Sequence, residues 1–71
     1  MSVPLDLFRK KRPIYIDYPF ESAAFRWMGE DSKTYKKFYM GDEVKIPFSD
    51  NLFREAIRSG EVTSKEEYDR L

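Results

Sequence analysis

Lysine, arginine and tyrosine side chains are the groups in this chain with the greatest capacity for chemistry, and they gather in two stretches. One stretch is a run of four cations: Arg9, Lys10, Lys11 and Arg12. The other interleaves rings and cations: Tyr35, Lys36, Lys37, Phe38 and Tyr39. Cations neutralise phosphates or acidic protein surfaces, and aromatic rings stack on bases or fill pockets in a partner. Both stretches therefore indicate binding chemistry.

The sequence contains few residue types that could support catalysis. The chain contains no cysteine and no histidine, which removes the usual nucleophiles, the usual general base and the commonest metal ligand. Two groups of carboxylates remain, Asp42 with Glu43 and Glu66 with Glu67 and Asp69, but their spacing matches no calcium loop. The glycines are isolated, so there is no phosphate-binding loop. We predict a protein that is not an enzyme and that uses no metal or cofactor.

Size and charge narrow the class further. A chain of 71 residues forms one domain and buries about 60% of the surface that its unfolded form exposes. Residues 1–40 carry eight Lys and Arg against five Asp and Glu, and residues 41–71 carry five against eight. The N-terminal part of the chain is therefore basic, the C-terminal part is acidic, and the two net charges cancel. No apolar run is long enough for a signal peptide or a membrane span. We expect a cytoplasmic protein that is a monomer when free.

The periodicity of the sequence predicts where the elements lie. Alternating apolar and polar residues predict strands over 14–18, 24–28, 34–40 and 43–48, of which the last three form a meander with short polar turns. Ser49 and Asp50 then cap a helix that ends at Gly60, and the spacing of Ser64 and Glu67 is that of a capping box for a short last helix. The fold class is α+β: a three- to four-stranded antiparallel sheet with one packed helix and a short C-terminal helix.

The same periodicity predicts which side chains form the core and which face outwards. The predicted core residues are Phe25, Trp27, Phe38, Val44, Ile46, Phe48, Leu52, Ala56 and Ile57. Tyr35, Lys37 and Tyr39 point to the face opposite Phe38 and Met40, where they form a ring–cation patch. Residues 1–12 are predicted to be a flexible basic arm that precedes a domain spanning residues 13–71.

These features favour a small regulator that binds a larger protein and modulates its activity. Such a domain displays the residue types that are enriched at interfaces, and its arm pairs an apolar cluster with a cationic run. The predicted contact residues are Leu7, Phe8, Arg9, Lys10, Lys11 and Arg12 of the arm, with Tyr35, Lys37 and Tyr39 of the patch. Transcription or replication machinery is the predicted partner, with the chain acting as an accessory or viral inhibitor.

Three alternatives remain open. A sheet face that carries Tyr15, Tyr35 and Tyr39 could stack on single-stranded nucleic acid, although a net charge of zero disfavours a polyanion. A toxin-neutralising immunity protein also fits the size, but such proteins more often present an acidic face, and acidic residues dominate here only in the last third. Finally, Leu5, Leu7 and Phe8 could fold back on the domain instead of extending from it.

The segment Leu5-Asp6-Leu7-Phe8 resembles the apolar end of the peptide by which bacterial proteins dock on the replication sliding clamp. In that motif a glutamine usually precedes the leucine, and here Pro4 takes its place. The resemblance implies that Leu7 and Phe8 would fill the apolar pocket of the clamp.

Overall fold

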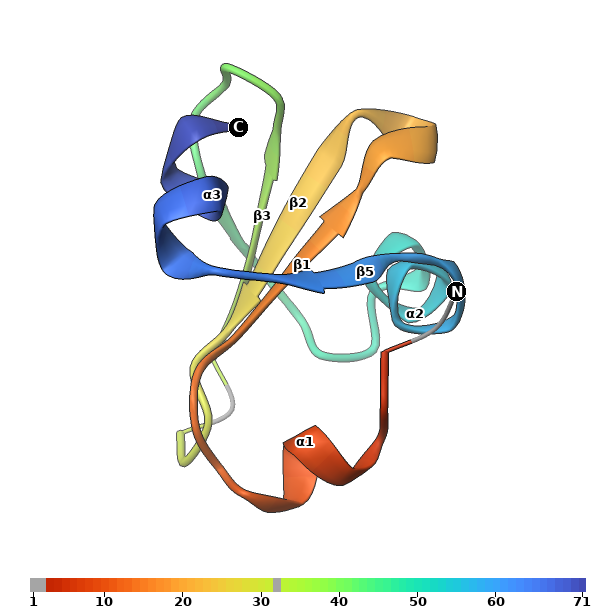
Figure 1. The fold of residues 1–71 in the computed structure, drawn as a ribbon, viewed down its shortest axis with the longest axis vertical. Coiled ribbons are helices and arrows are strands. Elements are labelled where there is room, and N and C mark those ends of the chain that lie inside the picture. Colours follow the sequence, from red (N-terminus) through yellow and green to blue (C-terminus); the bar gives the residue numbers. More distant parts are fainter. Residues whose placement is uncertain (1–2, 32) are drawn as a thin grey trace.

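A five-stranded antiparallel sheet is the central element of the structure, a computed structural model that describes residues 3–31 and 33–71 (Figure 1). The elements follow in the order α1 (Asp6–Arg9), β1 (Ile14–Tyr18), the 3-10 turn η1 (Pro19–Glu21), β2 (Ala23–Trp27), β3 (Thr34–Phe38), β4 (Val44–Ile46), α2 (Asn51–Ser59), β5 (Glu61–Thr63) and α3 (Lys65–Arg70). In space the strands are ordered β4-β3-β2-β1-β5. The predicted α+β class, with an antiparallel meander and two C-terminal helices, is confirmed.

The sheet has one strand more than predicted. Strand β5 pairs with β1 through Tyr15–Thr63, Ile16–Val62 and Asp17–Glu61. It takes three of the five residues between the end of α2 and the start of α3, a stretch too short to show a period of two. Because β5 pairs with β1, the C-terminal segment crosses in front of the meander, and the strands fan out with a strong twist (Figure 1).

Helices α2 and α3 begin where the sequence predicts, whereas α1 lies in the segment that the sequence predicts to be a flexible arm. The side chain of Asp50 accepts a hydrogen bond from the amide of Phe53 at 3.0 Å, and Ser64 Oγ accepts one from the amide of Glu67 at 3.1 Å. These caps satisfy amides that a helix start would otherwise leave without a partner. In α3, which has six residues, the cap cannot supply stability alone, so the helix depends on its packing against the sheet.

The core lies mainly over β1 and β2, not over the last two strands of the meander, β3 and β4. Its buried apolar residues are Val3, Ile14, Ile16, Tyr18, Ala23, Ala24, Phe25, Trp27, Phe53, Ala56 and Tyr68. The prediction is correct for Phe25, Trp27 and Ala56, and Ile46, Leu52 and Ile57 are partly buried against this core.

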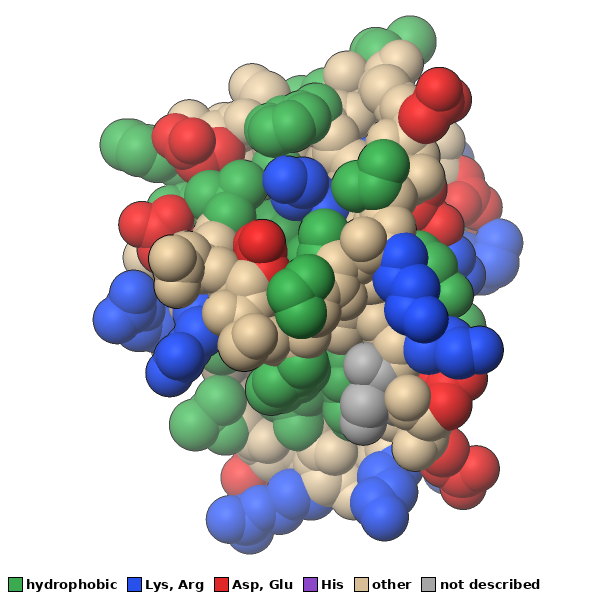
Figure 2. Space-filling view, turned by 180° about the vertical axis from the view of Figure 1, so that it is seen from behind, with side chains coloured by type: hydrophobic (Ala, Val, Ile, Leu, Met, Phe, Trp, Pro, Cys, Tyr) green, Lys and Arg blue, Asp and Glu red, His purple; other side chains and the backbone are tan. Residues whose placement is uncertain are grey.

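Three predicted core residues are wrong: Phe38, Val44 and Phe48 are each about half exposed. The reason is the position of α2, which packs on β1 and whose Phe53 ring contacts Phe25 of β2 at 5.5 Å between centroids. Strands β3 and β4 extend beyond the helix, so Phe38 and Val44 on that face remain accessible. Phe48, on the connection from β4 to α2, contacts Phe53 but stays half exposed. Figure 2 shows the molecule from behind the view of Figure 1. Hydrophobic side chains lie over the middle of the face seen there, and Lys and Arg lie mostly along its margins.

The N-terminal residues differ from the predicted flexible arm. Val3 is 2% exposed, and its amide donates a hydrogen bond to the carbonyl of Ile57 at 2.8 Å. Leu7 and Phe8 in α1 are half-buried and pack against the core, with the Phe8 ring 4.9 Å from that of Trp27 in an edge-to-face arrangement. The described part of residues 1–12 is therefore folded onto the domain, because its apolar residues close one end of a small core.

In the described part of the chain, no helix is long and apolar enough to cross a membrane.

Candidate partner-binding surfaces

The ring–cation patch lies on the face of the sheet opposite α2, as the alternation predicts. Pairing of Tyr35 with Arg26 and of Lys37 with Ala24 puts these side chains on one face of β2 and β3. That face is not open, because α3 lies over part of it. The Tyr68 ring contacts Tyr15 at 5.4 Å between centroids, and Lys37 Nζ lies 5.1 Å from the centre of the Tyr68 ring.

A network of hydrogen bonds joins this face to α3. The hydroxyl of Tyr68 donates a hydrogen bond to Glu43 Oε2 at 2.6 Å. Arg26 donates to both oxygens of the same carboxylate, with Nε at 3.0 Å from Oε2, and its guanidinium carbon lies 4.3 Å from the centre of the Tyr35 ring. Burial lowers the pKa of Arg26, but the hydrogen bond and the charge of Glu43 outweigh it, so the pKa is raised overall. Both oxygens of Glu43 are thus engaged within the fold.

Tyr39 is likewise engaged within the fold. Its hydroxyl donates a hydrogen bond to Oδ1 of Asp17, which comes from β1 across the sheet. Burial, followed by this hydrogen bond, raises the pKa of Tyr39 to about 12. In a stacking surface made of Tyr15, Tyr35 and Tyr39, the Tyr15 ring already contacts Tyr68 and the Tyr35 ring already contacts Arg26, which leaves fewer open rings for single-stranded nucleic acid. A contact between the ring–cation patch and a protein partner stays a prediction.

The basic run from Arg9 to Arg12 is exposed and connects α1 to β1. All four side chains are exposed, and none of them forms an ion pair with residues 3–31 or 33–71. The backbone of the run is held in place. Lys11 has a φ of 52°, and Gly29 approaches so closely that a Cβ at that position would lie 2.4 Å from the Lys11 carbonyl oxygen. The run is thus a cationic surface on a fixed backbone.

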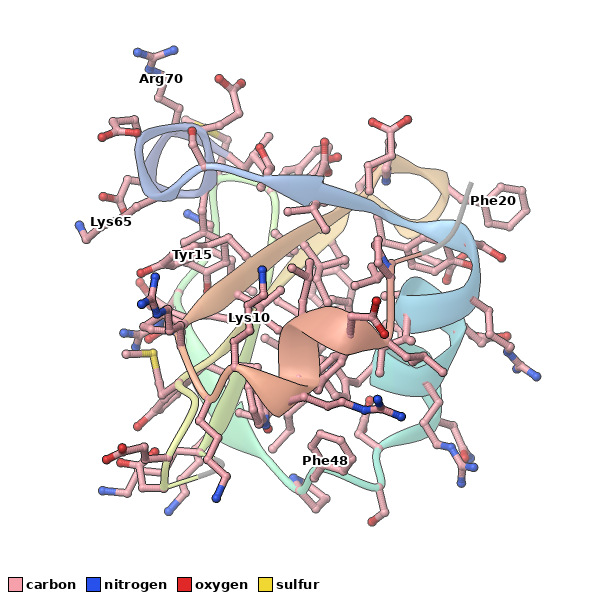
Figure 3. The ribbon with its side chains drawn as sticks, turned by 60° about the horizontal axis from the view of Figure 1, so that its bottom comes forward. Lys10, Tyr15, Phe20, Phe48, Lys65 and Arg70 are labelled. Atoms are coloured by element: carbon pink, nitrogen blue, oxygen red, sulfur yellow. The ribbon has the colours of Figure 1, made fainter. Side chains whose placement is uncertain are left out.

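Helices α1 and α2 border a groove that the sequence did not reveal. Its volume is about 380 Å³, and its lining residues are Leu5, Phe8, Phe48, Arg54, Ile57 and Arg58. We call it the α1–α2 groove. Figure 3 shows Phe48 beside α1, on the connection that leads from β4 to α2. The rings of Phe8 and Phe48 meet edge to face at 6.1 Å and both contact Trp27, so the wall of the groove rests on the core.

A second accessible apolar feature lies at one end of the sheet. Phe20 in η1 is 84% exposed, and Met40, just after β3, is 88% exposed. The two loops are neighbours, since the amide of Tyr39 donates a hydrogen bond to the carbonyl of Ser22 at 2.8 Å. We call Phe20 and Met40 the apolar tip. Figure 3 shows the Phe20 ring projecting away from the rest of the molecule.

Sequence reasoning missed Arg54 and Arg58, although a signal for them was present. They lie four residues apart, on the polar side of the amphipathic helix α2. Side chains at this spacing are neighbours on a helix, and like charges there disfavour each other unless a partner pairs with them. Neither arginine forms an ion pair with any described residue. No group of three or more Asp and Glu that could hold a metal ion occurs among the described residues.

Comparison with known proteins assigns this chain to a family. The family model described as Tis1 immunity protein matches residues 1–70. The chain belongs to this family. The Immune protein Tis1 of Pseudomonas aeruginosa (strain UCBPP-PA14) is 39% identical over 61 residues, which cover 83% of this chain and 79% of that relative.

A solved structure resembles the fold of this Tis1 family member. A chain in the crystal structure of the complex between the Type VI effector Tas1 and its immunity protein aligns with a TM-score of 0.86 at 31% identity. The alignment covers 97% of this chain and 92% of that one. The likeness therefore extends over the N-terminal segment, the sheet and the C-terminal helices.

Membership of the Tis1 family supports the coarser prediction from the sequence, a small protein-binding regulator. It gives no support to transcription or replication machinery as the partner. One alternative considered from the sequence, a toxin-neutralising immunity protein, matches the description of the family. The argument against it, the lack of an acidic face in the first two thirds of the chain, is therefore not a reliable guide for this family.

The resemblance of Leu5–Phe8 to a clamp-docking peptide also loses its basis. Phe8 is half-buried against Trp27, and Leu7 packs against the core, so neither side chain is free to fill the pocket of another protein.

Proposed function

We propose that this chain is an immunity protein that binds a Type VI effector of the Tas1 kind and neutralises it. The observation that carries the proposal is the full-length likeness to a chain from the complex between Tas1 and its immunity protein. At 31% identity and a TM-score of 0.86, this likeness extends to sequence as well as to fold. The family match over residues 1–70 supports the same conclusion.

The make-up of the chain suits inhibition by binding. Its basic run, α1–α2 groove and apolar tip are accessible, whereas in the ring–cation patch the Tyr39 hydroxyl is bonded to Asp17 and Lys37 lies over the Tyr68 ring. A domain of this size can block a larger protein by covering part of its surface, and an interface of standard size buries about 800 Å² on each partner. This chain exposes 4825 Å² in total, so such an interface would occupy a modest fraction of it.

The test is co-expression with a Tas1-type effector from the same strain in a bacterial host. Induction of the effector alone is expected to stop growth, and co-induction of this chain is expected to restore it. The purified pair should elute as one complex in gel filtration. A matched control is a variant whose core is broken, Phe25→Asp, because Phe25 is fully buried. If the wild-type chain neither restores growth nor co-elutes with the effector, the proposal is wrong.

A further inference from the structure

We infer that the α1–α2 groove is the effector-binding site, and that it takes an effector segment in which an apolar side chain is flanked by carboxylates. This inference rests on the proposed function. It names the surface that binds the effector and the chemistry of the effector segment that this surface recognises. The groove combines apolar walls, which include the rings of Phe8 and Phe48, with two arginines, and aromatic residues and arginine are enriched at protein interfaces.

The apolar walls favour a protein segment as the occupant. Leu5 is 69% exposed and Phe48 is 50% exposed, and the groove brings them together with the half-buried Phe8 and Ile57. Single exposed apolar residues are ordinary, but a concave group of them at a fixed geometry is typical of a docking site. The geometry is fixed because Phe8 and Phe48 rest on Trp27, and because the amide of Val3 is bonded to the carbonyl of Ile57.

The two arginines indicate the charge of that occupant. Arg54 and Arg58 line the groove side by side and lack an ion-pair partner among the described residues. Arg26 shows the contrast, because its guanidinium is already paired with Glu43. Aspartate or glutamate of the partner can pair with either free guanidinium through two parallel hydrogen bonds, which adds direction to the apolar contact. The neighbouring basic run, also unpaired, would draw an acidic surface towards this side of the molecule.

The inference is tested by measuring the kinetics of binding to the Tas1-type effector for four variants. The groove variants are Arg54→Glu with Arg58→Glu, and separately Leu5→Asp. A charge control, Lys10→Glu with Arg12→Glu, makes the same change in net charge at the basic run. An apolar control, Phe20→Ala with Met40→Ala, removes the apolar tip. All these side chains are exposed, so the variants are expected to fold, which circular dichroism and thermal unfolding check.

The arginine variant is expected to bind about 100-fold more weakly or worse, chiefly through faster dissociation, and Leu5→Asp is expected to weaken binding about 10-fold or more. The charge control should slow association by about 10-fold or less, and added salt should erase that effect. The apolar control should bind like the wild type. Equal losses in the arginine variant and the charge control would mean that long-range attraction, not the groove, determines affinity, and would overturn the inference.

A second readout uses the one tryptophan of the chain, which lies beneath the groove. With 5-fluorotryptophan at position 27, the single fluorine resonance is expected to shift when effector is added. An unchanged resonance in a complex that does form would place the contact elsewhere.

Loss of binding in the tip variant with the arginine variant unaffected would also overturn the inference while leaving the proposed function intact. So would a groove that mediates self-association instead. A wild-type chain that does not bind the effector would overturn both.

Discussion

The hydroxyl of Tyr68 lies 2.6 Å from the carboxylate of Glu43, a residue 25 positions earlier in the chain. This bond ties the last helix to the segment that leads into β4, and Arg26 of β2 binds the same carboxylate. One face of the sheet is therefore partly covered by a helix too short to fold alone. The more accessible surfaces lie around α1, α2 and the loops.

The bond between Tyr68 and Glu43 should be measurable as stability. Tyr68→Phe keeps the ring but removes the donor, so we expect the free energy of unfolding to fall by about 1–2 kcal/mol. Tyr68→Ala also removes a buried ring, and we expect a loss of about 3–5 kcal/mol. Urea unfolding followed by circular dichroism measures both. Tyr35→Phe is the matched control, because no hydrogen bond of the Tyr35 hydroxyl is present among the described residues, and it should change stability little. Equal effects at the two tyrosines would contradict this account.

Gly29 should tolerate a side chain poorly. Its φ is +86°, and a Cβ would lie 2.4 Å from the carbonyl oxygen of Lys11. Gly29→Ala therefore combines backbone strain with a clash against backbone, and we expect a loss of at least about 2 kcal/mol in the free energy of unfolding.

The control for Gly29 is Gly41→Ala. There the nearest atom, the carbonyl oxygen of Phe38, lies 3.1 Å from the added Cβ, so a smaller loss is expected. Hydrogen exchange should also quicken in residues 9–12 of the Gly29 variant, because the turn no longer fits against the basic run. Unchanged exchange together with unchanged stability would show that Gly29 does not hold the run.

Local rules account for what could be predicted from the sequence. Strand β1 was predicted with the bounds that the structure has, because β-branched and aromatic residues alternate between two prolines. The caps at Asp50 and Ser64 were also correct, since capping depends on neighbours in the chain. The ring–cation patch was placed on the correct face for the same reason, a period of two.

Long-range pairing accounts for what could not be predicted. Gly60 lets the chain pass β1 closely, since a Cβ there would lie 2.9 Å from the Asp17 carbonyl oxygen. This approach allows β5 to pair with β1 and places α2 over β1. The helix therefore does not cover Phe38 and Val44, which the sequence places in the core of the meander. The packing of Phe8 on Trp27 and the assembly of the α1–α2 groove likewise depend on contacts between distant segments, which no local pattern encodes.

The N-terminal segment should contribute to stability rather than hang free. Phe8→Ala removes ring contacts with Trp27 and Phe48, so we expect a loss of about 1–3 kcal/mol. Phe20→Ala makes the same change at a ring that is 84% exposed and should stay within about 0.5 kcal/mol of the wild type. Thermal unfolding of the two variants side by side measures the difference. If Phe8→Ala is as harmless as Phe20→Ala, the N-terminal segment behaves as the flexible arm that the sequence predicts over residues 1–12.

Stability should also decline at alkaline pH because two tyrosines are held in their protonated form. Burial and the bond to Asp17 raise the pKa of Tyr39 to about 12, and burial and the bond to Glu43 raise the pKa of Tyr68 above its ordinary value. In the unfolded chain both titrate near pH 10, so this contribution is complete below about pH 10 and is lost as the pH rises towards 12. Urea unfolding at pH 9 and at pH 11.5 measures the loss. Tyr39→Phe with Tyr68→Phe should lower stability at pH 9 and flatten the decline above it. A decline as steep in this double variant as in the wild type would assign the effect to other groups, such as the lysines.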